Sequence, residues 1–517
     1  MADLPTAPYR GPSLLRSLAS SWLGLIAGIG IAFFLSPFVV GKLGAGWYGV
    51  WAVAGQFTGY LYLLDFGVRE SIIRYTSKYA ARGQSDQLNR VLTSAILIYS
   101  SITLLAGITV GLCIWGIPHW FDLAPEYWRD TRIALFFTGL TIAQTFVFNV
   151  FAGVVTGMRR WDIGNAMGVL VNLGRAALLV VFLNAGYGIV AVAAIQFFVA
   201  LVGGIATTII ALSLLRQHRM AFQWQRLGIR RFRATARRIF GYGAYVIVNN
   251  VGEKIIGASD AIVVGLFLPI TAVAHFAVAG SLIGYLKAIL STTAQVFNPL
   301  ASHLHTLRQG EEMRRALLLG VAINVIVTLP VAAAFILLGD QFIALWMGKE
   351  FARPSGEVLA VLGGAAALSA PQYIVSSVLY GISRHRTIAM LRVVEAAANL
   401  ALSIALVKWV GLVGVALGTA VPSAVIVVGV LPLIVCPMLG LDLVDYYDRA
   451  YLRPLMAVVP FAAGAYWLRT SAMPQSLPEF FAAIAALTAI YIPCAFGLGL
   501  NAPERALVMR RYGWRAA

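Results

Sequence analysis

The sequence predicts an all-α polytopic membrane protein with about fourteen transmembrane helices, in two six-helix lobes followed by a terminal helix pair. Three observations predict this class. First, 60% of the 517 residues are hydrophobic and 12% are charged, whereas about a quarter of a soluble domain is charged. Second, the apolar residues form runs of about twenty, which is the length that crosses a bilayer as a helix. Third, parts of the sequence recur at a nearly constant offset.

The apolar runs follow one another with short connections. The predicted spans are 17–40, 46–73, 90–116, 132–156, 162–184, 188–214, 239–267, 271–299, 315–338, 356–380, 388–408, 411–436, 454–470 and 479–499. The first run is too long for a cleavable signal peptide and continues into more membrane segments. The longest connection, 215–238, is rich in arginine.

The orientation follows from lysine and arginine, which collect on the cytoplasmic side of a membrane protein. With both termini on the same side, the segments on that side carry 28 of the 39 basic residues and the opposite loops carry 7. We therefore expect an inner (cytoplasmic) membrane protein with both termini in the cytoplasm. The net charge of +18 then reflects this bias and does not indicate a nucleic-acid partner.

The repeat relates the first half of the chain to the second. Residues 52–61 (AVAGQFTGYL) and 277–286 (AVAGSLIGYL) share seven of ten positions at an offset of 225. A second match, at an offset of 223, pairs 188–193 with 411–416. An even number of helices in each half makes the repeat parallel. The predicted parts are an N-terminal six-helix lobe (1–215), a basic cytoplasmic linker (216–238), a C-terminal six-helix lobe (239–440) and a terminal helix pair with a cytoplasmic tail (441–517).

The cysteines indicate neither a metal nor a disulfide framework. Cys113, Cys436 and Cys494 lie in apolar stretches without the spacing of metal ligands. We therefore expect no metal and no cofactor.

Three basic residues near the middle of spans are candidate substrate-binding groups. Arg175 and Lys287 have no carboxylate three or four residues away on their helices, and Lys254 has only the adjacent Glu253. A cation at that depth needs a partner helix, water or an anionic ligand. An anion-binding cavity between the two halves is one interpretation, and interhelical ion pairs to Glu253 or Asp260 are the other.

Four other charges belong to the second span. Asp65 and Arg69 are four residues apart, as are Glu70 and Arg74, so each pair is expected to neutralise itself on one helix face. A structural pair and a substrate-binding role for Arg69 both remain open. Glu253 and Asp260, seven residues apart, are candidate sites for proton or sodium coupling.

The chain resembles the polysaccharide, O-antigen (Wzx-type) flippases of the multidrug/oligosaccharidyl-lipid/polysaccharide (MOP) exporter superfamily. The resemblance rests on KLGAGWYGVWAVAG and LLDFGVRESIIRY in the first two spans, on TGMRRWDIGNAM after span four, and on SDAIVVGLFLP at the end of span seven. It covers spans 1–12 in order. The matching residues are Gly44, Tyr48, Gly49, Asp65, Gly67, Arg74, Arg159, Asp162, Asn165 and Asp260.

The resemblance implies a two-lobed transporter that moves a polyprenyl-pyrophosphate-linked oligosaccharide across the cytoplasmic membrane for O-antigen, capsule or exopolysaccharide synthesis. It also implies a cationic central cavity. The partners would be the lipid-linked oligosaccharide, membrane lipids, and the polymerase and glycosyltransferases of the pathway.

Two other functions are compatible with the class. A multidrug or cation antiporter of the same superfamily should have carboxylates in the cavity of its first half, and the first span here has none. A membrane glycosyltransferase or ligase needs catalytic carboxylates in a sizeable outer loop, whereas the outer loops have about 3–17 residues. The sequence therefore favours a transporter over an enzyme.

Overall fold

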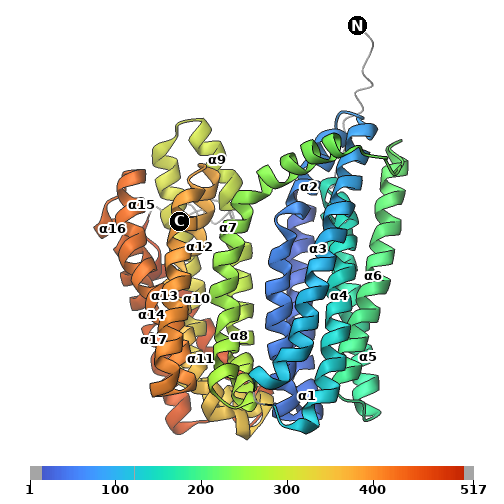
Figure 1. The fold of residues 1–517 in the computed structure, drawn as a ribbon. Helices are drawn as coiled ribbons and strands as arrows, with labels where there is room; N and C mark the ends of the chain where they lie inside the picture. The colour runs from blue at the N-terminus through green and yellow to red at the C-terminus, as the bar shows by residue number, and fades with distance from the viewer. Residues whose placement is uncertain (1–13, 122, 503, 506–517) are drawn as a thin grey trace. The chain divides into compact units, whose positions relative to one another are not determined.

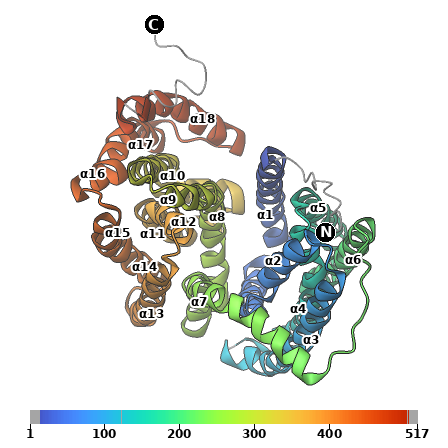
Figure 2. The ribbon, with the colours of Figure 1, turned by 90° about the horizontal axis from the view of Figure 1, so that it is seen from above.

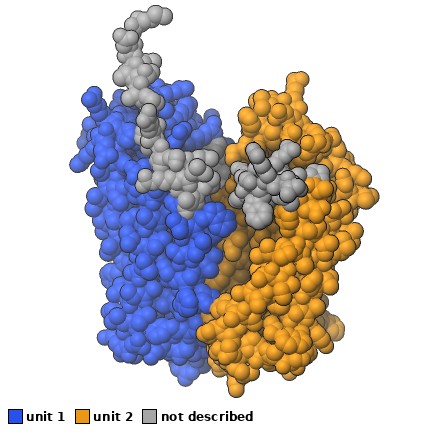
Figure 3. Space-filling view, turned by 180° about the vertical axis from the view of Figure 1, so that it is seen from behind, with its two compact units in different colours: residues 1–251 blue, residues 252–517 orange. Residues whose placement is uncertain are grey.

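The computed structural model describes residues 14–121, 123–502 and 504–505, without the side chains of 14–19, 118, 242–256, 258 and 385. The chain divides into two compact units, residues 1–251 (unit 1) and residues 252–517 (unit 2), which Figure 3 distinguishes by colour. All regular secondary structure in the described residues is helical. The prediction of an all-α fold is therefore confirmed.

In its described residues, unit 1 holds five long helices, two shorter helices after the first of them, and the beginning of a further helix (Figure 1). These elements are α1 (Leu14–Leu61), the 3₁₀ helix η1 (Tyr62–Asp65), α2 (Val68–Ala80), α3 (Ser85–Trp120), α4 (Pro125–Gly157), α5 (Trp161–Asn184), α6 (Ile189–Gln217) and the first turns of α7 (Ile229–Phe267).

Helix α1 is too long to cross a membrane once. Its 48 residues correspond to about 72 Å at a rise of 1.5 Å per residue, more than twice the thickness of a hydrocarbon core of about 30 Å. The helix is kinked at Gly44, which has φ 78° and ψ 163°. Only glycine adopts this region readily. The kink lies between the first two predicted spans, so α1 contains the first span and the beginning of the second, up to Leu61.

The second predicted span, 46–73, is not one helix. Phe66 (φ 49°) and Gly67 (φ 68°) both have left-handed backbone conformations between η1 and α2. Asp65 therefore ends η1, whereas Arg69 lies in the first turn of α2. The expectation that these two residues share a continuous helix face is wrong, because the two consecutive left-handed residues interrupt the helical hydrogen bonding between them.

The segment after α6 is attached to unit 1. The Asn89 side-chain amide donates to the carbonyl of Ala221 at 3.1 Å, and the backbone N–H of Gln225 donates to Thr93 Oγ1 at 3.3 Å. In the first turns of α7, the carbonyl of Ile239 accepts a hydrogen bond from Ser71 Oγ at 2.8 Å. Residues 220–240 therefore cover the core formed by α2, α3, α4 and α6.

Unit 2 begins with the remainder of α7. It continues with α8 (Ile270–Ala294), α9 (Phe297–Thr306), α10 (Gly310–Met347), α11 (Lys349–Ser369), α12 (Pro371–Gly381), α13 (His385–Val410), α14 (Leu412–Ala424), the π-helical η2 (Val425–Val430), α15 (Leu431–Leu439), α16 (Leu443–Tyr447), η3 (Asp448–Leu452), α17 (Arg453–Ser471), α18 (Leu477–Cys494) and η4 (Ala495–Gly499). Among the predicted spans of this half, α11 and α12 form a pair bent by 40°, and α14, η2 and α15 follow one another directly as one helical segment with a π-helical turn.

Ten helices in the described residues are long and apolar enough to cross a membrane, or eleven if the bent pair α11 and α12 is one span. These helices make the chain a multi-pass membrane protein. The count of fourteen remains a prediction. Part of the difference is that Ser20–Asp65 counts once although it covers most of the first two predicted spans.

The two units contain the same close helix contact. A Cβ atom at Gly157, where α4 ends, would lie 2.8 Å from the carbonyl oxygen of Ile73 in α2. At Gly381, where α12 ends, a Cβ atom would lie 2.5 Å from the carbonyl oxygen of Asn298 in α9. The glycines are 224 residues apart and the carbonyls 225, which is the offset of the sequence repeat. The repeat is therefore present in the packing of each unit.

Candidate functional site

A buried carboxylate in unit 2 is held by polar side chains of two other helices. Asp260, near the end of α7, is 5% exposed. Its Oδ2 accepts a hydrogen bond from Thr419 Oγ1 of α14 at 2.6 Å, and its Oδ1 accepts one from Asn399 Nδ2 of α13 at 3.4 Å. Ser259 Oγ donates to Asn399 Oδ1 at 3.3 Å. A carboxylate enclosed in this way is a candidate site for a proton or a small cation.

Lys287 belongs to the surroundings of this carboxylate. It lies on α8, is partly buried, and its ammonium group attracts Asp260 electrostatically. The sequence analysis left open whether Lys287 meets a ligand or a carboxylate on another helix. The charge of Asp260 stabilises Lys287 at this depth, but a long lysine side chain can also bind an anion at its other side.

Arg175 has a different environment in unit 1. It lies on α5, is partly buried, and its Nη2 donates to Asn172 Oδ1 one turn earlier at 3.0 Å. In the part of the chain that the structure describes, no carboxylate forms an ion pair with Arg175. A guanidinium has five N–H donors, and those not bound to Asn172 are available to an anion or to water.

Glu253 and Lys254 lie within α7, but their side chains are outside the described residues. Their predicted roles in ion coupling and in substrate binding are therefore not tested. Whether Arg175, Lys254 and Lys287 line one cavity also remains a prediction, since Arg175 belongs to unit 1 and the two lysines belong to unit 2.

Asp65 stabilises the break between η1 and α2. Its carboxylate accepts a hydrogen bond from the hydroxyl of Tyr99 on α3 and interacts with the backbone N–H groups of Gly67 and Arg69. The side chain of Arg69 is exposed and attracts Asp65 electrostatically. Asp65 thus satisfies N–H groups that the beginning of α2 leaves without helical partners.

Glu70 and Arg74 lie one turn apart on α2, and both are exposed. The helical spacing that the predicted ion pair needs is therefore present. The ion pair between Glu70 and Arg74 remains a prediction.

Several polar residues in or near these sites were not predicted from the sequence. Asn399 and Thr419 were not identified, because uncharged polar residues are common in membrane helices and their spacing gives no signal. Glu395 on α13 was missed although it lies in an apolar span, three residues after Arg392. It is 2% exposed, and its Oε2 lies 3.2 Å from Arg392 Nη1 and 3.4 Å from Gln372 Nε2.

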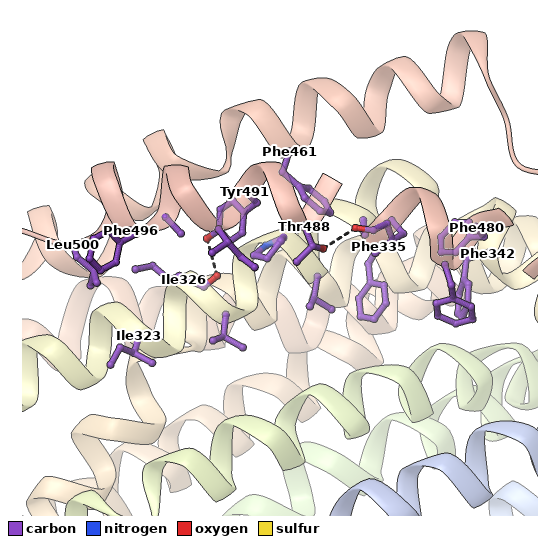
Figure 4. A pocket seen from close by; sticks show the side chains of 18 residues that line it. Ile323, Ile326, Phe335, Phe342, Phe461, Phe480, Thr488, Tyr491, Phe496 and Leu500 are labelled. Carbon is purple, nitrogen blue, oxygen red and sulfur yellow. Dashed lines mark hydrogen bonds between the residues drawn. The ribbon is translucent and has the colours of Figure 1, made fainter. Parts of the chain in front are cut away.

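Unit 2 also contains an apolar groove between α10, α17 and α18, with a volume of about 630 Å³ (Figure 4). Phe335, Phe461 and Phe480 are among its aromatic lining residues. Its two hydroxyl groups are already bonded to backbone carbonyls, Tyr491 to Ile326 and Thr488 to Ile484, each at 2.7 Å. The groove therefore suits a hydrocarbon chain and offers no polar group to a sugar or a phosphate.

Comparison with known proteins gives a family for this architecture. A model of the family described as "Polysaccharide biosynthesis protein" matches residues 14–305, more than half of the chain. The uncharacterized membrane protein EpsK of Bacillus subtilis is 21% identical over 492 residues, which are 93% of this chain and 94% of EpsK. The probable low-salt glycan biosynthesis flippase Agl15 of Haloferax volcanii is 23% identical over 190 residues, 37% of this chain and 40% of Agl15.

Solved structures with the same fold are transporters. The lipid II flippase MurJ in an inward closed conformation matches with a TM-score of 0.68 and 15% identity, over 97% of this chain and all of MurJ. An inward-facing multidrug MATE transporter of the MOP superfamily matches with a TM-score of 0.56 and 17% identity, over 83% of this chain and 95% of the transporter. At these identities the likeness establishes the fold, which flippases and multidrug transporters share.

Proposed function

Since the chain belongs to the polysaccharide biosynthesis protein family, whose fold is that of the MOP superfamily transporters, we propose that it flips a polyprenyl-pyrophosphate-linked oligosaccharide across the cytoplasmic membrane. The oligosaccharide of this substrate would then be used in the synthesis of a cell-surface polysaccharide. The names of a relative and of a structural neighbour agree with this substrate class, since Agl15 is named a glycan biosynthesis flippase and MurJ a lipid II flippase.

The observation that carries the proposal is the pair of cations within apolar helices, Arg175 in unit 1 and Lys287 in unit 2. A diphosphate and a glycan cannot cross hydrocarbon unaided, because each polar group would lose its hydrogen bonds to water. Arginine and lysine replace that water with charge-assisted hydrogen bonds to phosphate oxygens. Lys254 is proposed as a third such group, and Arg69 as a fourth.

The lipid tail of the substrate needs no polar site. It can stay in the bilayer or occupy the apolar groove between α10, α17 and α18, whose hydroxyl groups are already bonded. Charges and apolar lining are thus found in different places, as an amphipathic ligand requires.

The membrane potential can drive the proposed transport. Outward movement of two negative charges across an inside-negative membrane is favourable by about 4.6 kcal/mol per 100 mV. Asp260 is proposed as a site at which a proton or sodium ion couples to transport, with Glu253 as a second candidate. The hydroxyl of Thr419 would supply an oxygen ligand beside the carboxylate, whereas the Nδ2 of Asn399 donates to Asp260 and would hold the carboxylate in place.

The multidrug antiporter remains the second candidate, because the MATE transporters share the fold. The carboxylate of Asp260 favours it, since a cation antiporter needs an acidic site in the membrane. The half-buried cation Arg175 disfavours it, because a cationic drug would be repelled by it. An enzymatic function has no support among the relatives, which are named as transporters or flippases where a function is given.

The orientation is part of the proposal, and reporter fusions test it. Fusions of a reporter that is active only in the periplasm, at residues 226 and 510, should both be inactive. Activity at either position would reverse the orientation and place the entry side of the transporter on the wrong face of the membrane.

Complementation tests the transport function. In a strain without the chromosomal copy, we expect Lys287→Arg to restore surface glycan and Lys287→Gln to lose most of it at normal membrane abundance. Arg175→Lys and Arg175→Gln form the matched pair in unit 1. Removal of a hydrogen bond to a charged group costs about 1.5–3 kcal/mol, or about ten- to hundredfold in affinity. Normal glycan with well-expressed neutral variants at Arg175, Lys254 and Lys287 would exclude the anion-binding role.

A further inference from the structure

A pocket at one end of unit 1 combines arginines with tyrosine rings. It has a volume of about 330 Å³, at the lower end of the range for small-molecule sites, and lies where α2 ends and α3 and α7 begin. Its basic residues are Arg90 of α3 and Arg231 and Arg238 of α7. In Figure 2 the first turns of α7 run beside α3 at this end of the unit.

The first turns of α7 present three different faces. Ile239, Phe232 and Ala236 pack on the core of unit 1. Arg231, Ala234, Thr235 and Arg238 line the pocket, with the i, i+3, i+4, i+7 spacing of one helix face. Arg230, Arg233 and Arg237 are exposed and are not part of the pocket. Two of five neighbouring arginines thus point to one site.

The remaining wall of the pocket is aromatic and apolar. Tyr75 and Tyr79 of α2 have stacked rings with centroids 5.9 Å apart, and Val91 and Ile239 are buried beside them. The carbonyl of Arg238 accepts a hydrogen bond from the hydroxyl of Tyr75 at 3.4 Å, which ties α7 to α2. The site therefore has a packed aromatic and apolar wall on one side and exposed arginine side chains on the other.

The surroundings of the pocket are those of a membrane interface. Trp224 is 54% exposed, Ile229 is 83% exposed and Phe240 is 37% exposed, all within or next to the arginine-rich segment. A helix with exposed apolar side chains and arginines lies in the headgroup region, with its apolar groups towards the acyl chains. Tyrosine is also typical of that depth. A ligand of the pocket therefore meets both arginines and hydrocarbon.

We propose that this pocket binds the phosphate of an anionic phospholipid of the surrounding bilayer, through Arg90, Arg231 and Arg238. Each guanidinium can donate two parallel hydrogen bonds to a phosphate. The glycerol and the first part of the acyl chains contact the rings of Tyr75 and Tyr79. A bound lipid links α3 to α7 and fixes the beginning of α7 on unit 1. This site is independent of the proposed substrate.

Native mass spectrometry of the purified full-length protein tests the proposal. Phosphatidylglycerol and phosphatidylcholine with identical acyl chains are titrated onto wild type, the pocket variant Arg231→Gln/Arg238→Gln, and the control variant Arg233→Gln/Arg237→Gln. Both variants remove the same charge from the same helix. We expect wild type and the control variant to bind phosphatidylglycerol about tenfold more tightly than phosphatidylcholine. The pocket variant should lose this preference, because removal of a charge-assisted hydrogen bond costs about that much affinity.

A third titration, with inorganic phosphate, separates a lipid from a soluble anion. Displacement of phosphatidylglycerol by millimolar phosphate would overturn the lipid assignment, as would equal loss of preference in both variants or no preference in wild type. If the pocket variant does not fold, Arg90→Gln on α3 replaces it, because this exposed arginine makes no contribution to the core. Loss of preference in Arg90→Gln supports the site, and its retention contradicts it.

Discussion

Units 1 and 2 use one helical arrangement to hold polar groups of opposite charge. In unit 2, Asp260 of α7 accepts hydrogen bonds from Asn399 of α13 and Thr419 of α14. At offsets of 225 and 223, Asp260 and Thr419 correspond to Leu35 of α1 and Gln196 of α6 in unit 1, and the cation Arg175 lies on α5, the helix that corresponds to α13. The first unit therefore has a cation on the helix that, in the second unit, carries the amide that bonds a carboxylate.

This difference shows that the repeat fixes the backbone and leaves the electrostatics free to diverge. The contacts at Gly157 and Gly381 are nearly the same in the two units, because a helix crossing at that distance excludes any side chain. No such constraint acts on Arg175 and Asn399, whose side chains point to polar neighbours. A transporter that couples the movement of an anion to that of a cation needs a site for each ion. One site has to carry positive charge and the other negative charge.

The largest functional difference between the two units is expected on substitution of Asp260. Asp260→Asn keeps the shape and an acceptor for Thr419 but removes the charge, so we expect surface glycan to fall about ten- to hundredfold at normal membrane abundance. Position 35 in unit 1 is already a leucine, so the comparison variant in that unit is Gln196→Leu, at the position equivalent to Thr419, and it should leave transport largely intact. Both are measured as surface glycan per membrane-inserted protein. Equal losses in the two variants would remove the functional difference between the units.

An intermediate effect is expected at the break between η1 and α2. Asp65→Asn and Arg69→Gln should each lower membrane abundance, and Asp65 more strongly, because it also bonds Tyr99 and the backbone of α2. Arg69→Gln alone leaves the half-buried carboxylate of Asp65 without its neighbouring cation, so the double variant should recover part of the loss of abundance. The membrane abundance of each variant is measured by quantitative immunoblots of membranes.

A well-expressed but inactive double variant would contradict a purely structural role for this pair. Arg69 would then belong to the substrate site, and unit 1 would contribute two cations to it.

The smallest effect is expected at the repeated glycine contact, and it compares the two units directly. Gly157→Ala and Gly381→Ala each place a Cβ within 2.8 Å or 2.5 Å of a backbone carbonyl oxygen. Overpacking of this kind costs about 1–3 kcal/mol, so both should lower the melting temperature of the detergent-solubilised protein, Gly381→Ala slightly more. Gly164→Ala, which meets nothing within 4 Å, is the control and should not. A lower melting temperature for only one of the two glycine variants would show that the contact is not equivalent in the two units.

The sequence predicts the helical class and the repeat because both depend on composition and period. Long apolar runs identify membrane helices, and AVAGQFTGYL recurs as AVAGSLIGYL at the offset found in the packing. The charged site residues are also visible, since Asp260 and Arg175 stand out in apolar runs. The helix break at Phe66 and Gly67 is not visible, because a phenylalanine in a left-handed conformation has no sequence signal.

The partners of the charged residues could not be predicted for a different reason. Asn399 and Thr419 lie 139 and 159 residues after Asp260, and their meeting depends on the packing of three helices. A single sequence contains no measure of that packing. Glu395 could have been found, because Arg392 and Glu395 are spaced as an i, i+3 pair within one span.

The attachment of residues 220–240 to unit 1 also bears on how the protein is made. Asn89, Thr93 and Ser71 bond this segment from within the first half of the chain, so the ribosome has delivered every part of that core before it begins unit 2. At about 5–20 residues per second, synthesis of the 266 residues of unit 2 takes about 13–53 s. Throughout that interval the nascent chain can carry a closed N-terminal half, with its polar backbone groups covered, while the membrane insertion machinery still handles the rest.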